Sequence, residues 1–79
     1  NPSTTINFTL PQNTFVNFSV FNILGEKVVE LYNGDMTQGE KEIIWNGLND
    51  DNKNVSSGIY IYRISTPEKH LSGKMILQK

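Results

Sequence analysis

The sequence contains no cysteine, so neither disulfide bonds nor a thiolate zinc site can hold the fold together. It has no apolar run near the roughly 18 residues that a membrane-spanning helix needs, and no charged-then-apolar secretory leader opens it. An excess of positive charge is also missing, because seven basic and eight acidic residues give a net charge of −1. That balance argues against a nucleic-acid partner. These absences favour a domain without a membrane span that depends on one hydrophobic core.

Side chains that perform catalysis are scarce as well. His70 is the only histidine, and its place beside Lys69 at the start of the final predicted strand is typical of a solvated turn residue. Asp50 and Asp51 are adjacent, so in an extended segment their carboxylates point to opposite sides instead of converging as a glycosidase pair does. We therefore predict no catalytic residue, no cofactor and no enzymatic activity.

One loop is rich in the hard oxygen ligands that calcium prefers. Asp50, Asn52 and Asn54 have EF-hand spacing, but Val55 stands where the turn glycine belongs and the bidentate glutamate is missing. A loop that bonds to itself through Asx turns is the favoured interpretation, and no metal ligand is predicted. Whether segment 49–54 binds calcium stays open from the sequence.

The length allows one domain, which we place at residues 1–79. The abrupt opening at Asn1-Pro2-Ser3 indicates a piece excised from a longer protein. Residues 63–79 carry four basic residues and one acidic residue, whereas residues 1–62 carry three basic and seven acidic residues. The basic end is a candidate docking surface, although lysines on edge strands also discourage aggregation.

Alternation of apolar and polar residues predicts six short strands, at residues 4–10, 14–22, 27–33, 40–45, 58–65 and 71–78. The third segment is too short for a typical helix, and Asn33-Gly34 ends it at once. The fifth is apolar on both faces, as is typical of a central strand. The expected fold is all-β, a small antiparallel immunoglobulin or fibronectin-III-like sandwich of six to seven strands.

The chain is organised around the stretch from Trp45 to Ile64. A strand ending on the only tryptophan leads into a polar segment, and Gly58 then opens a strand of β-branched and aromatic residues, which we interpret as a hairpin-like corner. Tyr60 is a candidate tyrosine corner, with its hydroxyl bonded to the main chain of the preceding bend. We expect Trp45, Gly58 and Tyr60 to be structural. The predicted core consists of Ile6, Phe8, Leu10, Val16, Phe18, Val20, Val28, Leu31, Ile43, Trp45, Tyr60, Tyr62, Ile64, Met75 and Leu77.

Two groups of apolar residues allow a binding function. An aromatic platform for sugar stacking could form, although such a stripe more often belongs to the core. Its candidates are Phe15, Phe21, Tyr32 and Tyr62. A set of isoleucines could form an exposed patch or could face the second sheet, so the oligomeric state is open. These are Ile44, Ile59, Ile61 and Ile76.

Four pieces of sequence stand in order along the chain: Asn1-Pro2-Ser3-Thr4-Thr5-Ile6, Phe21-Asn22-Ile23-Leu24-Gly25-Glu26-Lys27-Val28, Trp45-Asn46-Gly47 followed by Ser57-Gly58-Ile59-Tyr60-Ile61-Tyr62-Arg63-Ile64, and Gly73-Lys74-Met75-Ile76-Leu77-Gln78-Lys79. Together they resemble the C-terminal sorting domain of type IX secretion system cargo. No piece is diagnostic alone, but the four cover essentially the whole chain. The segment from Asp50 to Asn54 departs from the usual aspartate-glycine turn because it has no glycine.

The resemblance implies a non-catalytic, immunoglobulin-like sorting signal at the C-terminus of a larger protein secreted by Bacteroidetes. It implies passage through the periplasm, recognition by an outer-membrane translocon or shuttle, and removal by a surface sortase. The upstream cargo domain would end in the medium or at the cell surface. In the family the last strand is associated with recognition, which here means Lys74, Met75, Ile76, Leu77, Gln78 and Lys79. Within this set we expect Lys74 and Lys79 to supply charge, and Met75 and Leu77 to anchor the strand to its own core.

Two other functions stay open. The chain could be a carbohydrate-binding or adhesive β-module of a secreted enzyme. It could also be an immunoglobulin-like assembly domain of a flagellar hook-capping protein, which shares the Trp-Asn/Asp-Gly and Gly-x-Tyr elements.

Overall fold

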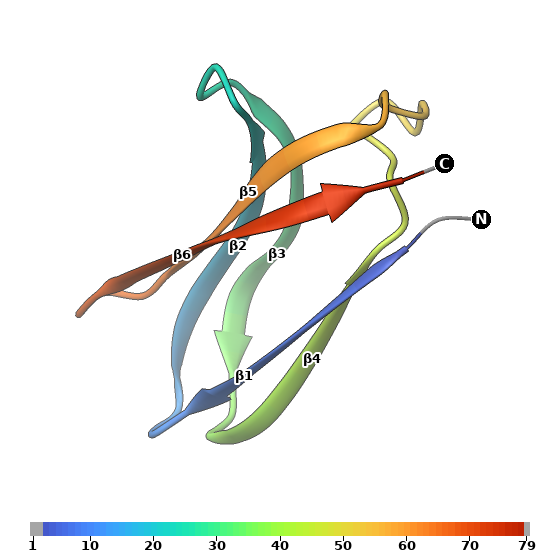
Figure 1. Ribbon diagram of the computed structural model, residues 1–79. Helices are drawn as coiled ribbons and strands as arrows, with labels where there is room; N and C mark the ends of the chain where they lie inside the picture. Colours follow the sequence, from blue (N-terminus) through green and yellow to red (C-terminus); the bar gives the residue numbers. More distant parts are fainter. Residues whose placement is uncertain (1–2, 79) are drawn as a thin grey trace.

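The computed structural model describes residues 3–78, which form six β-strands. The strands are β1 (Thr4–Leu10), β2 (Thr14–Asn22), β3 (Lys27–Met36), β4 (Gly39–Trp45), β5 (Gly58–Ser65) and β6 (His70–Leu77) (Figure 1). Every strand pairing is antiparallel. The predicted all-β class is therefore confirmed. No helix long and apolar enough to cross a bilayer occurs within the described range.

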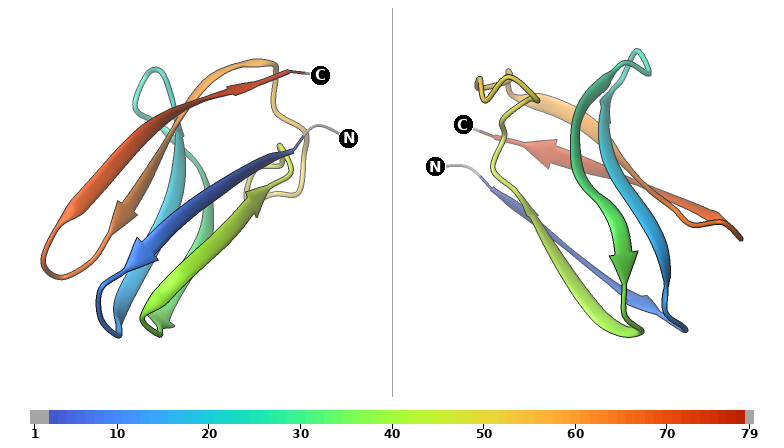
Figure 2. Two further views of the ribbon diagram at one scale, coloured as in Figure 1. Left: turned by 60° about the horizontal axis from the view of Figure 1, so that its bottom comes forward. Right: turned by 180° about the vertical axis from the view of Figure 1, so that it is seen from behind.

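The strands form two sheets that pack as layers (Figure 2). β1 and β4 make a two-stranded sheet, while the other sheet has the order β3-β2-β5-β6. β4 and β5 therefore belong to different sheets, and the hairpin-like corner predicted between Trp45 and Ile64 is wrong. The connection between these two strands carries the chain from one layer to the other.

The core lies between the sheets, where the apolar side of each strand meets the opposite layer. Its buried apolar residues are Ile6, Leu10, Val16, Phe18, Val20, Val29, Trp45, Tyr60, Ile64, Met75 and Leu77. Every predicted core residue either belongs to this set or packs against it. Among these buried apolar residues, Val29 is the one that the sequence prediction omitted.

β3 is longer than predicted. The Asn33-Gly34 pair was expected to end it, yet its ladder with β2 continues until Thr14 pairs with Met36. The Asn33 side chain takes part in this pairing, because the Asn17 amide donates a hydrogen bond to its Oδ1 at 3.1 Å. A turn signal is therefore overridden by the neighbouring strand.

The alternation of side chains between the two faces of β3 is interrupted at two places. Val28 and Leu31 each have no residue opposite them in the β2 register, so two residues of β3 face one of β2 at these places. Such bulges shift the side-chain alternation by one position. As a result Val29 is buried, whereas Val28 and Leu31 are only partly buried against the core.

β1, β2 and β5 have the predicted bounds, and the ends of β4 and β6 differ from the prediction by no more than one residue. β4 begins at Gly39 and β6 spans His70–Leu77, so Gln78 follows the last strand. In the β2–β3 turn, Gly25 has φ of +85°, a conformation that glycine adopts without the clash of a Cβ atom. The turn closes on the Asn22 side chain, whose Oδ1 accepts hydrogen bonds from the amides of Leu24 and Glu26 at 3.0 Å.

Candidate interaction surface on the terminal strand

β6 forms one edge of the four-stranded sheet (Figure 1). It pairs with β5 along its whole length, and within residues 3–78 no strand pairs with its other side. An edge strand presents a row of main-chain N–H and C=O groups, which can pair with an extended segment of another protein. The free side of β6 is therefore a candidate interaction surface.

The predicted recognition residues alternate along this strand. Met75 and Leu77 are 5% and 1% exposed and lie in the core, whereas Ile76 is 65% exposed. Lys74 and Gln78 are also exposed. The predicted residue Lys79 lies outside the described residues. Only the exposed half of the set is available to a partner, while the buried half holds β6 against the sandwich.

The position of β6 depends on a contact that the sequence prediction missed. Gly73 faces Tyr62 across the β5–β6 ladder, and a Cβ atom at Gly73 would overlap the Tyr62 ring. This ring also stacks on Phe18, with centroids 5.7 Å apart. The close approach of β6 to the ring therefore requires glycine at this position. A glycine within an apolar strand pattern was the only available signal.

The predicted structural residues meet at the start of β5. The Tyr60 hydroxyl donates a hydrogen bond to the Ser56 carbonyl at 2.7 Å, which is the geometry of a tyrosine corner. The Trp45 ring packs edge-on against Tyr60, with centroids 5.0 Å apart, and Trp45 Nε1 donates to the Leu48 carbonyl at 2.9 Å. Gly58 opens β5 beside them. This cluster joins the end of the two-stranded sheet to β5, the strand that carries β6.

The polar loop before β5 bonds to itself, as the Asx-turn prediction requires. Asn49 Oδ1 accepts hydrogen bonds from the amides of Asp51 at 2.9 Å and Lys53 at 3.1 Å. The Asn49 amide donates to the Lys53 carbonyl at 2.9 Å. Residues 3–78 contain no group of three or more acidic or histidine side chains placed to hold a metal ion.

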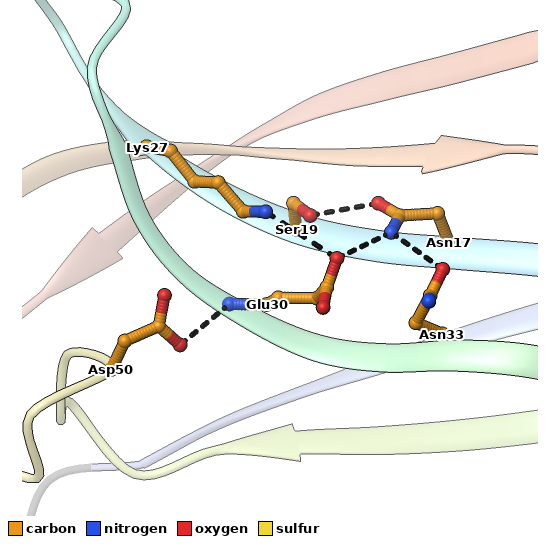
Figure 3. Close-up of polar contacts among 6 residues, drawn as sticks. All are labelled: Asn17, Ser19, Lys27, Glu30, Asn33 and Asp50. Carbon is orange, nitrogen blue, oxygen red and sulfur yellow. Dashed lines mark hydrogen bonds and ion pairs between the residues drawn. The ribbon is translucent and has the colours of Figure 1, made fainter.

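The same loop docks on the edge of β3, a contact that links residues distant in sequence. The Asp50 amide donates to the Val28 carbonyl at 3.2 Å, and the Glu30 amide donates to Asp50 Oδ1 at 3.2 Å. Figure 3 shows Asp50 beside β3. Val28 is a bulged residue of β3. The loop therefore provides hydrogen-bond partners for the Val28 carbonyl and the Glu30 amide at a place where the pairing of β3 with β2 is irregular. This contact was not predicted, since nothing in the local sequence identifies its partner.

A polar network lies on the outer side of the four-stranded sheet (Figure 3). Asn17 Nδ2 donates to Glu30 Oε1 at 2.8 Å, and Asn17 Oδ1 accepts from the Ser19 hydroxyl at 2.8 Å. Lys27 Nζ lies 3.3 Å from Glu30 Oε1. The network ties β2 to β3, and its members satisfy one another.

The remaining candidates do not form a site. His70 Nδ1 lies 3.0 Å from Ser65 Oγ, but both residues are on the surface and no carboxylate of the described residues bonds to this pair. The candidate aromatic platform is divided between two faces. Phe15 is exposed, whereas Tyr32 and Tyr62 pack against the core. The four aromatic residues therefore do not present one flat surface to a sugar.

The two-layer antiparallel sandwich with its tyrosine corner is immunoglobulin-like in architecture. Residues 1–78 match the family of secretion system C-terminal sorting domains, and the chain belongs to this family, which serves type IX secretion. No curated protein matches the chain. A solved structure of FlgD from P. aeruginosa is similar, with a TM-score of 0.73 and 20% sequence identity. The similarity covers 95% of this chain and 59% of that chain, and at this identity it shows the fold alone.

Proposed function

We propose that this domain is a non-catalytic sorting signal that directs an attached cargo through the type IX system by presenting β6 to a carrier. The family match over residues 1–78 supports the sorting role. The observation that carries the proposal is the free edge of β6, held in place by buried side chains and flanked by exposed ones. A segment of the outer-membrane translocon or shuttle pairs with this edge through main-chain hydrogen bonds.

The later steps follow from the same proposal. The cargo travels through the periplasm, crosses the outer membrane and reaches the surface or the medium, where a sortase removes the domain. Within this scheme the domain contributes recognition, and the sortase supplies the chemistry. Lys74 and Lys79 are proposed to provide charge for the carrier, and the exposed Ile76 provides apolar contact.

A reporter fusion tests the proposal directly. Residues 1–79 are fused to the C-terminus of a periplasmic reporter enzyme and expressed in a type IX host and in a translocon-deficient derivative. We expect the reporter at the surface or in the medium of the first strain and in the periplasm of the second. Equal distribution in the two strains would refute the sorting role.

Variants of β6 must leave the core intact. Deletion of residues 74–79 removes the buried Met75 and Leu77, so failure of that variant could reflect unfolding. Lys74→Glu combined with deletion of residues 78–79 changes only exposed or terminal positions. We expect this variant to keep its melting temperature and to accumulate in the periplasm. Normal delivery would show that the carrier does not read these positions.

A second candidate is the assembly function considered from the sequence, with which the fold shared with FlgD is compatible. An assembly domain would associate with copies of itself. Sedimentation velocity of the purified domain over a wide concentration range separates the two functions. A stable oligomer would favour assembly, and a monomer would favour the sorting signal.

A further inference from the structure

The outer side of the four-stranded sheet carries a group of apolar residues that the core does not use. Ile59 pairs with Ile76 across β5 and β6, and these residues are 46% and 65% exposed. Phe21 pairs with Ile61 in the adjoining row across β2 and β5. We call these four residues the outer patch. Side chains on a strand alternate between faces, so the outer patch lies opposite the buried residues of the same strands.

Two cations that make no ion pair within residues 3–78 border the outer patch. Lys74 stands opposite Ile61 in the β5–β6 register, and Arg63 follows Ile61 on the same face of β5. Lys27 and Glu30 make the ion pair found within residues 3–78, so neither Lys74 nor Arg63 has a carboxylate partner there. Arg63 also lines a shallow hollow together with Phe21 and Ile61. A carboxylate next to an apolar side chain would complement this arrangement in both charge and shape.

The opposite face of the sandwich has different chemistry. On the outer side of the two-stranded sheet, the 56% exposed Ile44 shares its face with Glu42 and Glu40. Within residues 3–78, the outer side of the two-stranded sheet therefore lacks the combination of clustered isoleucines and unpaired cations that the outer patch has. Ile44 provides a matched control, because it is the same residue type at similar exposure outside the outer patch.

We propose that the outer patch, together with Arg63 and Lys74, is a second docking surface for a folded protein whose apolar contact area is bordered by carboxylates. The inference rests on the proposed function, since that protein is the carrier that also engages the β6 edge. Electrostatic complementarity of this kind sets orientation and rate of encounter. The carrier thus contacts the domain at an edge and at a face.

The geometry favours a protein over an anionic membrane. Phe21 and Ile61 are only partly exposed and belong to a sheet face, whereas membrane insertion needs apolar side chains that protrude. The whole chain has a net charge of −1, and Glu30 neutralises Lys27 near the patch. Within the described residues the basic C-terminal end supplies Arg63, Lys69 and Lys74, which is fewer than the roughly four to eight clustered cations that hold a domain on anionic lipid.

β5 offers probes that cannot act through the edge. It lies between β2 and β6 with both sides paired, so its side chains reach a partner only through a sheet face. Ile59→Thr and Arg63→Glu change the docking surface, while Ile44→Thr and Lys53→Glu are matched controls elsewhere. The reporter fusion measures the ratio of surface to periplasmic enzyme. We expect a decrease of roughly tenfold for each surface variant, the effect of losing one important interface residue, and no change for the controls.

Thermal melting of each purified variant excludes unfolding as the cause, and Ile59→Ala and Arg63→Gln replace any variant that melts early. Delivery of Ile59→Thr and Arg63→Glu at control levels, while the wild-type fusion still requires the translocon, would overturn this inference and leave the proposed function standing. Failure of the wild-type fusion would overturn both. Binding of the purified domain to phosphatidylglycerol vesicles, lost in the same two variants, would assign the surface to a membrane and also overturn the inference.

Discussion

At the scale of single residues, the Tyr60 hydroxyl ties the start of β5 to the loop before it. Its hydrogen bond to the Ser56 carbonyl is 2.7 Å long, and the ring lies against Trp45 in the core. The hydroxyl is partly buried, so a lost bond is not fully replaced by water. One hydroxyl group therefore helps to set the path by which the chain passes between the two sheets.

Tyr60→Phe removes this hydrogen bond and keeps the ring. We expect a loss of about 1 kcal/mol in the free energy of unfolding, which lowers the melting temperature by about 4–8 °C in a domain of this size. Tyr62→Phe is the control, because the Tyr62 hydroxyl makes no hydrogen bond within residues 3–78. Differential scanning calorimetry compares the two. Equal melting temperatures for the two variants would count against the tyrosine corner.

Gly73→Ala tests the close approach between β5 and β6. The new Cβ atom would overlap the Tyr62 ring, so the strands must separate or the ring must move. Overpacking of this kind costs about 1–3 kcal/mol. Gly34→Ala is a suitable control, since its Cβ would meet the Tyr32 side chain no closer than 3.7 Å. Urea unfolding should show a lower midpoint for the first variant only, and a Gly73→Ala midpoint equal to wild type would contradict the packing.

At the scale of elements, the alternation of apolar residues predicts six strands and almost the whole core, because each strand has one buried face. It does not predict the phase of β3, since the bulges at Val28 and Leu31 depend on pairing with β2. It also misplaces the end of β3, where the partner strand outweighs the Asn33-Gly34 turn signal. The free edge of β6 follows from strand order, which local sequence does not contain.

Asp50→Ala tests the docking of the β4–β5 loop on β3. The variant loses the carboxylate that accepts a hydrogen bond from the Glu30 amide. We expect this loss to lower the free energy of unfolding by about 1 kcal/mol, because the bond is at an exposed site. Asp51→Ala is the matched control, because the Asp51 carboxylate accepts no hydrogen bond from a described residue. Hydrogen exchange should show faster exchange of the Glu30 amide in the first variant alone. An unchanged rate would mean that Asp50 does not hold this edge.

At the scale of the whole molecule, the sandwich acts as a frame that places an edge and a face beside each other. Ile76 belongs to both surfaces, because it lies on the edge strand and forms part of the outer patch. If the carrier recognised the last residues as an unfolded segment, only their sequence would matter. If it recognises the folded domain, β5 and β2 are needed as well, since they carry the rest of the outer patch.

Trp45→Ala separates these two possibilities. Trp45 is fully buried, and truncation of such a side chain costs about 3–5 kcal/mol, which is most of the stability of a domain this small. The variant leaves every residue of β6 unchanged but removes the sandwich that presents it. We expect the fusion to stay in the periplasm, as shown by the ratio of intact surface to periplasmic reporter in a pulse-chase experiment. Circular dichroism of the purified variant verifies that the fold is lost, and delivery at the wild-type ratio despite that loss would mean that the carrier reads an unfolded tail.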